Sequence, residues 1–152
     1  MTTREPSAVD AIAEAYTSKL AALDPLSATE AGLKGYDHLM TDLSPAGHAE
    51  RAELHRATLR ELDQAAPVDK VDEVTLAAMR DRLGLAVELF EAGERTADLN
   101  VIFSPLQNLR DVLDLMPTET TDDWATIASR MAKVPDAVRG YIASLREGVR
   151  NG

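Results

Sequence analysis

The chain has 152 residues and a net charge of −10, with 26 Asp and Glu against 16 Lys and Arg. This negative field repels the phosphates of nucleic acids and of anionic membranes, so neither is an expected partner. The absence of cysteine excludes disulfides and thiolate metal ligands, and a hydrophobic content of 45% with only 4% aromatic residues predicts one folded region, 1–152, with a single aliphatic core.

The chain begins with a predicted helix. Apolar residues recur every three or four positions from about residue 7 to 24, and Ser7 followed by Asp10 is a typical helix cap. Pro25 predicts the end of this helix, because proline pushes the preceding residue out of the helical region. A short helical turn in LSATEAGL is expected next.

The stretch GLKGYDHLMTDLSPAG, residues 32–47, has no helical spacing. It is either a bend between two helices or a working site that gathers Asp37, His38 and Asp42. Glycine permits a positive φ, and aspartate in such a bend commonly accepts hydrogen bonds from nearby backbone amides. These properties favour a shaped connector over a site.

A second long helix is predicted from Ser44-Pro45 to about Ala66, because serine caps it, proline suits the first helical position and Pro67 follows its end. Its apolar face includes His55. The charged residues expected on its outer side are Glu50, Arg51, Glu53, Arg56, Arg60 and Glu61.

The next helix, at about 69–93, carries two apolar stripes. One contains Leu76, Met79, Leu83, Ala86 and Phe90, and the other contains Val71, Val74, Ala78, Leu85 and Leu89. Two stripes predict a helix that is buried on two sides. Gly93 is expected to end it, since glycine readily adopts the left-handed conformation after a helix.

The last third follows an irregular ADLNVIF segment. Ser104, Pro105 and Gln107 predict a capped short helix that ends before Pro117. Thr120 or Thr121 starts a final stripe of apolar residues from Trp124 to Val149, with Pro135 either as a kink or as a fresh helix start after Lys133.

No stretch shows the sustained alternation of a β-strand. We therefore predict an all-α fold: a mostly antiparallel bundle of about five to seven helices with no sheet. No window approaches the roughly 20 apolar residues of a membrane span, and the N-terminus has no apolar core of a signal peptide. These features, together with the lack of cysteine, predict a cytoplasmic protein that does not bind membranes.

Motifs for catalysis are missing from the sequence. There is no Gly-x-Ser-x-Gly elbow, no phosphate-binding loop and no His-Glu-x-x-His zinc motif. His48 and His55 share a helix face but are about 10 Å apart along the axis, too far to bind one ion. His55 is expected to be a partly buried histidine with one hydrogen bond. We predict no catalytic, cofactor-binding or metal-binding residue in this chain.

Three stretches carry a resemblance to a known family. They are AYTSKLAALDPLSATEAGLKGYDHLMTDLSPAG, LFEAGERTADLNVIFSPLQNLRDVLDL and TETTDDWATIASRMAKVPDAVRGYIASLREGVRNG. Their succession resembles the bacterial domain of unknown function 885 family (DUF885). Its members are several times longer and look like all-helical zinc metallopeptidases related to carboxypeptidases, with a His-Glu metal motif far downstream of the region that this chain matches.

The resemblance implies that this chain is a non-catalytic N-terminal portion that packs against a downstream catalytic domain. Zinc is then expected only in an intact member, and no metal ligand of the family can be transferred to this sequence. Tyr36, Asp37 and His38 become candidates for bordering the substrate cleft. Some apolar surface of this chain should remain uncovered on its own.

A different class of function also fits the sequence. The chain can be a self-sufficient helical interaction module, in which the acidic faces bind a basic partner or the remaining apolar stripe forms a symmetric homodimer.

Overall fold

The computed structural model describes residues 4–151, and over that range it contains α-helices, two short 3₁₀ helices and no strand. The elements in chain order are α1 (Ala8–Leu23), α2 (Pro25–Glu30), α3 (Pro45–Gln64), α4 (Lys70–Glu91), η1 (Glu94–Thr96), α5 (Pro105–Asp111), η2 (Val112–Leu115), α6 (Thr121–Met131) and α7 (Val134–Asn151). The seven α-helices of this range confirm the predicted all-α class and helix number.

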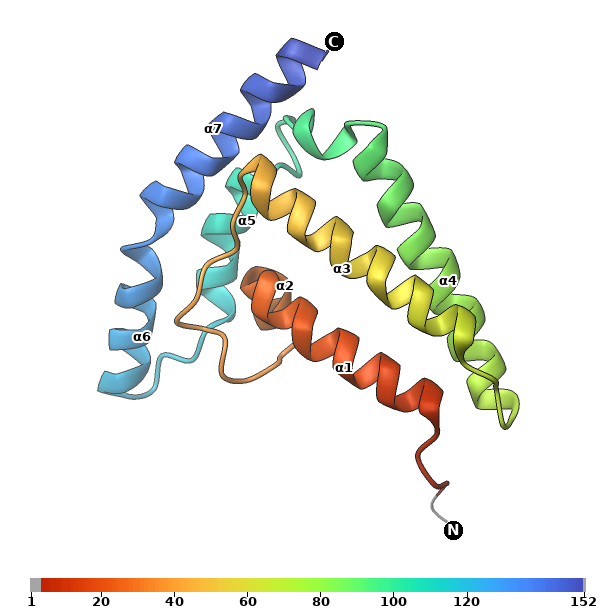
Figure 1. Cartoon of the computed structure of the whole chain (residues 1–152). Coiled ribbons are helices and arrows are strands. Elements are labelled where there is room, and N and C mark those ends of the chain that lie inside the picture. Colours follow the sequence, from red (N-terminus) through yellow and green to blue (C-terminus); the bar gives the residue numbers. More distant parts are fainter. Residues whose placement is uncertain (1–3, 152) are drawn as a thin grey trace.

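The first layer of the fold consists of α1, α3 and α4. Figure 1 shows these helices side by side, and α3 packs against both others and runs antiparallel to them. Their facing sides form an apolar cluster of Val9, Leu62, Leu76 and Leu83. Local sequence fixes where α3 begins, since the Ser44 side chain accepts a hydrogen bond from the Gly47 amide and Pro45 occupies the first turn.

A second apolar cluster lies among the other elements. Its buried residues are Leu26, Leu43, Leu109, Val112, Ala137 and Tyr141. The prediction of a single core is therefore wrong for the described residues, where two clusters form. A cavity lined largely by polar side chains interrupts the apolar packing, as described below.

The long C-terminal stripe is divided between two helices. α6 ends at Met131 and α7 begins at Val134, and the Lys133 carbonyl accepts hydrogen bonds from the amides of Asp136 and Ala137. Pro135 thus lies in the first turn of a fresh helix, where its missing N–H costs nothing. This resolves the alternative of a kink.

The packing of α4 differs from the prediction. Its first stripe faces the apolar cluster through Leu76 and Leu83, but Val71, Val74 and Leu85 of the second stripe are exposed. The expected burial on two sides is wrong within the described residues, because α3 covers one side of α4 and α4 lies at the edge of the layer (Figure 1).

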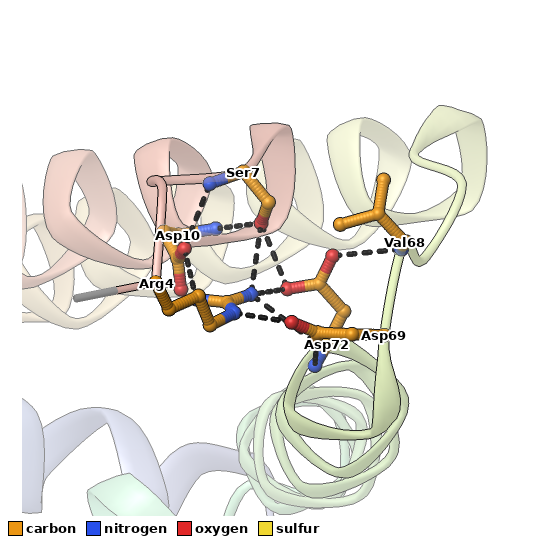
Figure 2. A network of polar contacts seen from close by, with 6 residues as sticks. All are labelled: Arg4, Ser7, Asp10, Val68, Asp69 and Asp72. Atoms are coloured by element: carbon orange, nitrogen blue, oxygen red, sulfur yellow. Dashed lines mark hydrogen bonds and ion pairs between the residues drawn. The ribbon is translucent and has the colours of Figure 1, made fainter. Parts of the chain in front are cut away.

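The N-termini of α1 and α4 are tied together by one arginine. Arg4 pairs with Asp10, Asp69 and Asp72, as Figure 2 shows. Asp72 is fully buried and also accepts hydrogen bonds from the Ser7 hydroxyl at 2.8 Å and from the backbone amide of residue 68 at 2.9 Å. Carboxylates favour helix N-termini, and the guanidinium balances their crowding.

These pairs shift the titration of the groups involved. The hydrogen bond from Arg4 is the main cause that lowers the pKa of Asp69, and the hydrogen bond from the Ser7 amide is the main cause that lowers the pKa of Asp10. The network therefore depends on ionised carboxylates.

Within residues 4–151, no helix combines the length and the apolar character needed to cross a bilayer.

Candidate functional site

A cavity of about 380 Å³ lies where α1, α2, α3, α4, η1 and α5 meet, and we call it the central cavity. Its polar lining residues are Asp24, Ser27, Glu30, Thr41, His48, Arg51, His55, Arg95, Asp98 and Asn108. Its apolar lining residues are Leu20, Leu26, Leu43, Ala52, Ala86, Phe90 and Pro105. The volume is within the usual range for small-molecule sites, and a mixed lining is typical of them.

Arg51 is the most firmly placed charge of the central cavity. One terminal nitrogen donates to the carbonyls of Asp42 at 2.8 Å and Leu23 at 3.4 Å, and the other lies 3.0 Å from His48 Nδ1. Because a guanidinium can only donate, Nδ1 accepts and the His48 proton resides on Nε2. Burial, followed by the charges of Arg51 and Arg95, lowers the pKa of His48 to about 4, so this imidazole is neutral at pH 7.

His55 lies one helical turn beyond Arg51. Its Nδ1 is 3.4 Å from the Tyr16 hydroxyl, and the two rings are tilted with centroids 5.9 Å apart. Burial is the main cause that lowers the pKa of His55, and Arg95 and Arg51 add to the effect. His55 is partly buried and has one hydrogen-bond partner among the described residues, as the sequence predicted.

Residues 31–44, which we call the connector, join α2 to α3. Gly32 and Gly35 have φ values of 72° and 96°, so the predicted need for positive φ is confirmed. The segment is held by Arg130 of α6, whose Nε donates to the Leu39 carbonyl at 2.8 Å and whose Nη2 donates to the Tyr36 carbonyl at 3.1 Å. These bonds explain how a stretch without regular secondary structure has a defined course.

The candidate residues of the connector do not line the central cavity. Tyr36 is partly buried and offers its carbonyl to Arg130, and Asp37 accepts a 2.7 Å hydrogen bond from the Thr29 hydroxyl. His38 is exposed. Asp42 accepts a hydrogen bond from the Ser44 amide, as expected for a shaped bend. The suggestion that Tyr36, Asp37 and His38 border a substrate cleft stays a prediction.

The sequence was compared with known protein families and with curated proteins. The profile of the family described as "Bacterial protein of unknown function (DUF885)" matches residues 25–152. The chain belongs to the DUF885 family. A search of curated proteins found no match.

The DUF885 chain also presents an apolar loop, residues 99–103. Val101, Ile102 and Phe103 have 92%, 70% and 77% of their surface exposed, and Leu99 is exposed as well. The Asn100 side chain holds the backbone: its Oδ1 accepts from the amide of Ile102 at 2.9 Å and from that of Phe103. The Tyr141 hydroxyl anchors the start of the loop by donating to the Asp98 carbonyl at 2.6 Å. The apolar side chains are thus directed outward by a fixed backbone.

Sequence reasoning about this DUF885 chain missed two arginines. Arg51 was expected on the outer side of its helix but lines the central cavity, and Arg130 was not selected although it is fully buried. A signal for Arg51 existed, because it lies three residues after His48 and four before His55 and therefore shares their face. For Arg130 the sequence offers no comparable signal, since its acceptors, which are three backbone carbonyls and the Thr29 hydroxyl, all lie more than ninety residues away.

Metal-ligating side chains do not form a cluster in the described part of the DUF885 chain. Over residues 4–151, no three His, Asp or Glu side chains converge in a way that could hold an ion. His48 and His55 line the same cavity, but their Nδ1 atoms are engaged with Arg51 and Tyr16.

Proposed function

We propose that this chain is a non-catalytic helical portion of a DUF885 protein that packs against a metallopeptidase-like catalytic domain and helps to enclose it. The apolar loop carries the proposal, because three consecutive large apolar side chains are exposed. Isolated exposed apolar residues are common on proteins, but a contiguous patch usually marks an interaction surface.

The construction of the loop supports a role in packing. The Asn100 side chain accepts from the backbone amides of Ile102 and Phe103, and in the turn held by these bonds both apolar side chains are exposed. Each such side chain gains about 1.5–3 kcal/mol when it is fully buried. A partner that covers the loop therefore obtains a large part of a typical binding free energy from a few residues.

The exposed stripe of α4 points to a second area of contact. Val71 and Val74 are exposed on the side of α4 that α3 does not cover. A helix that is apolar on two sides is expected to be buried on both when all its neighbours are present. The stripe and the loop together match what a further domain would cover.

The gene provides the first test of this proposal. We expect the reading frame to continue beyond codon 152 and to encode a His-Glu metal motif with further ligands. A stop codon directly after codon 152 would contradict the proposal.

A binding experiment tests the surface itself. The downstream polypeptide is expressed separately and its affinity for the 152-residue chain is measured by calorimetry. Phe103→Ser should weaken binding at least tenfold, since it removes the largest apolar side chain of the loop. Trp124→Ser is the matched control, because Trp124 is an exposed aromatic residue on α6, outside the loop.

The alternative is a self-sufficient module that uses the same surface for a homodimer. Sedimentation equilibrium of the 152-residue chain separates the two. Tight dimerisation that Phe103→Ser abolishes, with no binding to the downstream polypeptide, would favour the homodimer and overturn the proposal.

A further inference from the structure

We propose that the central cavity binds a small monocarboxylate with an apolar body, held by the guanidinium groups of Arg51 and Arg95. This site is separate from the apolar loop. It does not depend on the packing role proposed above.

The first step rests on the donors of Arg51 that remain. A guanidinium has five N–H groups. Contacts to Leu23, Asp42 and His48 engage three of them, which leaves Nε and one Nη2 hydrogen. These contacts also fix the orientation of the group, so an anion that accepts the remaining hydrogens meets a preorganised donor.

The second step concerns Arg95 of η1. It lines the same cavity, and within residues 4–151 its guanidinium makes no ion pair. Its charge reaches both imidazoles, since Arg95 contributes to the lowered pKa of His48 and of His55, after burial as the main cause. Arg51 and the exposed Arg95 therefore both bring positive charge close to His48 and His55, which Asp24 and Asp42 oppose in part at His48.

The acids that line the cavity limit the charge of the ligand. Asp24, Glu30 and Asp98 are all in the lining. Asp24 is engaged internally, because its carboxylate accepts from the Thr41 hydroxyl at 2.6 Å and from the Ser27 hydroxyl at 2.8 Å. The remaining negative charge disfavours phosphates and other multiply charged anions. A carboxylate carries one charge and its planar geometry matches the guanidinium fork.

The apolar part of the lining suggests the rest of the ligand. Leu26, Ala52, Phe90 and Pro105 contribute to the cavity wall. A volume of about 380 Å³ is larger than a carboxylate group requires, so a hydrocarbon body can occupy the remainder. Each buried CH₂ group is then expected to tighten binding about fourfold.

NMR of the histidine ring C–H signals tests the site at pH 7. The probes are sodium acetate and sodium 3-methylbutanoate, added at constant ionic strength with sodium chloride as the balance. The signals of His48 and His55 should shift and saturate, with 3-methylbutanoate binding about sixtyfold more tightly than acetate when its three additional carbons are all buried. The His38 signals should not move, because His38 is exposed and lies outside the cavity.

One variant and its control test the contribution of Arg95. Arg95→Gln should weaken binding about tenfold, since it replaces the charged donor with a shorter, neutral polar side chain and so removes a charge-assisted hydrogen bond. Arg139→Gln should change nothing, because Arg139 is exposed on α7 and pairs with Asp136 only within its own helix turn. Shifts that do not saturate, equal affinity in Arg95→Gln, or tighter binding of inorganic phosphate than of 3-methylbutanoate would each overturn the proposal.

Discussion

Replacing Arg130 with methionine is expected to lower the free energy of unfolding by about 3–5 kcal/mol. The side chain is 0% exposed and donates to the carbonyls of Leu39, Pro25 and Tyr36 and to the Thr29 hydroxyl, at 2.8, 3.2, 3.1 and 2.9 Å. A hydrogen bond from a charged donor contributes about 1.5–3 kcal/mol.

The loss of these four hydrogen bonds does not lower the free energy of unfolding by their full sum. The Tyr36 carbonyl also accepts from the Leu39 amide, and the Pro25 carbonyl lies 3.1 Å from the Thr29 hydroxyl, whose single proton it shares with Asp37, so neither carbonyl is left wholly without a donor. Methionine fills most of the vacated volume and has no charge to desolvate. Both effects offset part of the stability that is lost with the hydrogen bonds. The bonds to the Leu39 carbonyl and the Thr29 hydroxyl dominate the remaining cost.

Urea unfolding followed by circular dichroism at pH 7 measures this change. The matched control is Arg139→Met, which removes an exposed ion pair on α7 and should stay within about 0.5 kcal/mol of the wild type. Hydrogen exchange should show faster exchange of connector amides in Arg130→Met. A variant as stable as the control would refute the reasoning that buried Arg130 holds the connector.

Three further outcomes are expected. Gly140→Ala should lower the free energy of unfolding by about 1 kcal/mol. An added Cβ lies 2.9 Å from the Ser44 amide nitrogen, and this overpacking outweighs the gain in helix propensity. In Gly84→Ala the Cβ meets nothing within 4 Å, so thermal melting should show stabilisation, and equal behaviour of the two variants would contradict the close packing. Asp72→Asn should lower the free energy of unfolding by about 1–3 kcal/mol, since it removes the buried charge that pairs with Arg4 and replaces one of two acceptor oxygens with a donor; an unchanged urea midpoint would contradict this. The pKa of His48 falls from 6.5 to about 4 on folding, so the unfolded chain binds the proton first and stability should decrease as the pH is lowered from 6.5 toward 4. The slope of the urea midpoint against pH should be smaller in His48→Gln, and an identical slope would show that His48 is not buried as neutral imidazole.

The ends of the helices could be predicted because capping is a local interaction. Ser7, Ser44 and Thr120 are the N-caps of α1, α3 and α6, and each side chain accepts from an amide three residues later. Such a bond depends on four residues that the sequence places together. The same holds for Gly93, whose φ of 79° follows the end of α4.

The central cavity could not be predicted in the same way. The contact between Arg51 and the Leu23 carbonyl joins residues 28 apart, and Arg95 approaches from η1 after the whole of α4. A charged residue near the edge of an apolar stripe is on average exposed, so the rule that placed Arg51 outside is sound and fails only because of tertiary contacts. Polar residues that gather inside a fold against the sequence pattern are the kind of exception that is expected at functional sites.

The connector accounts for the positions of Arg51 and Arg130. Backbone carbonyls that are removed from water need donors, and a segment without helix or strand supplies few of them from its own backbone. α3, α6 and α7 supply them: Arg51 donates to the Asp42 carbonyl, Arg130 to the Leu39 carbonyl, and Ser144 to the Leu43 carbonyl at 2.7 Å.

Order in the connector and the shape of the central cavity are therefore coupled. Thr41 and Leu43 belong to the connector and also line the cavity, and the Thr41 hydroxyl donates to Asp24, another lining residue that directly precedes α2. A change at Arg130 should then alter the cavity although Arg130 is not in its lining. In the NMR titration, Arg130→Met should bind 3-methylbutanoate more weakly than the wild type while Arg139→Met binds it equally. Unchanged affinity in Arg130→Met would show that the cavity is formed by the helices alone.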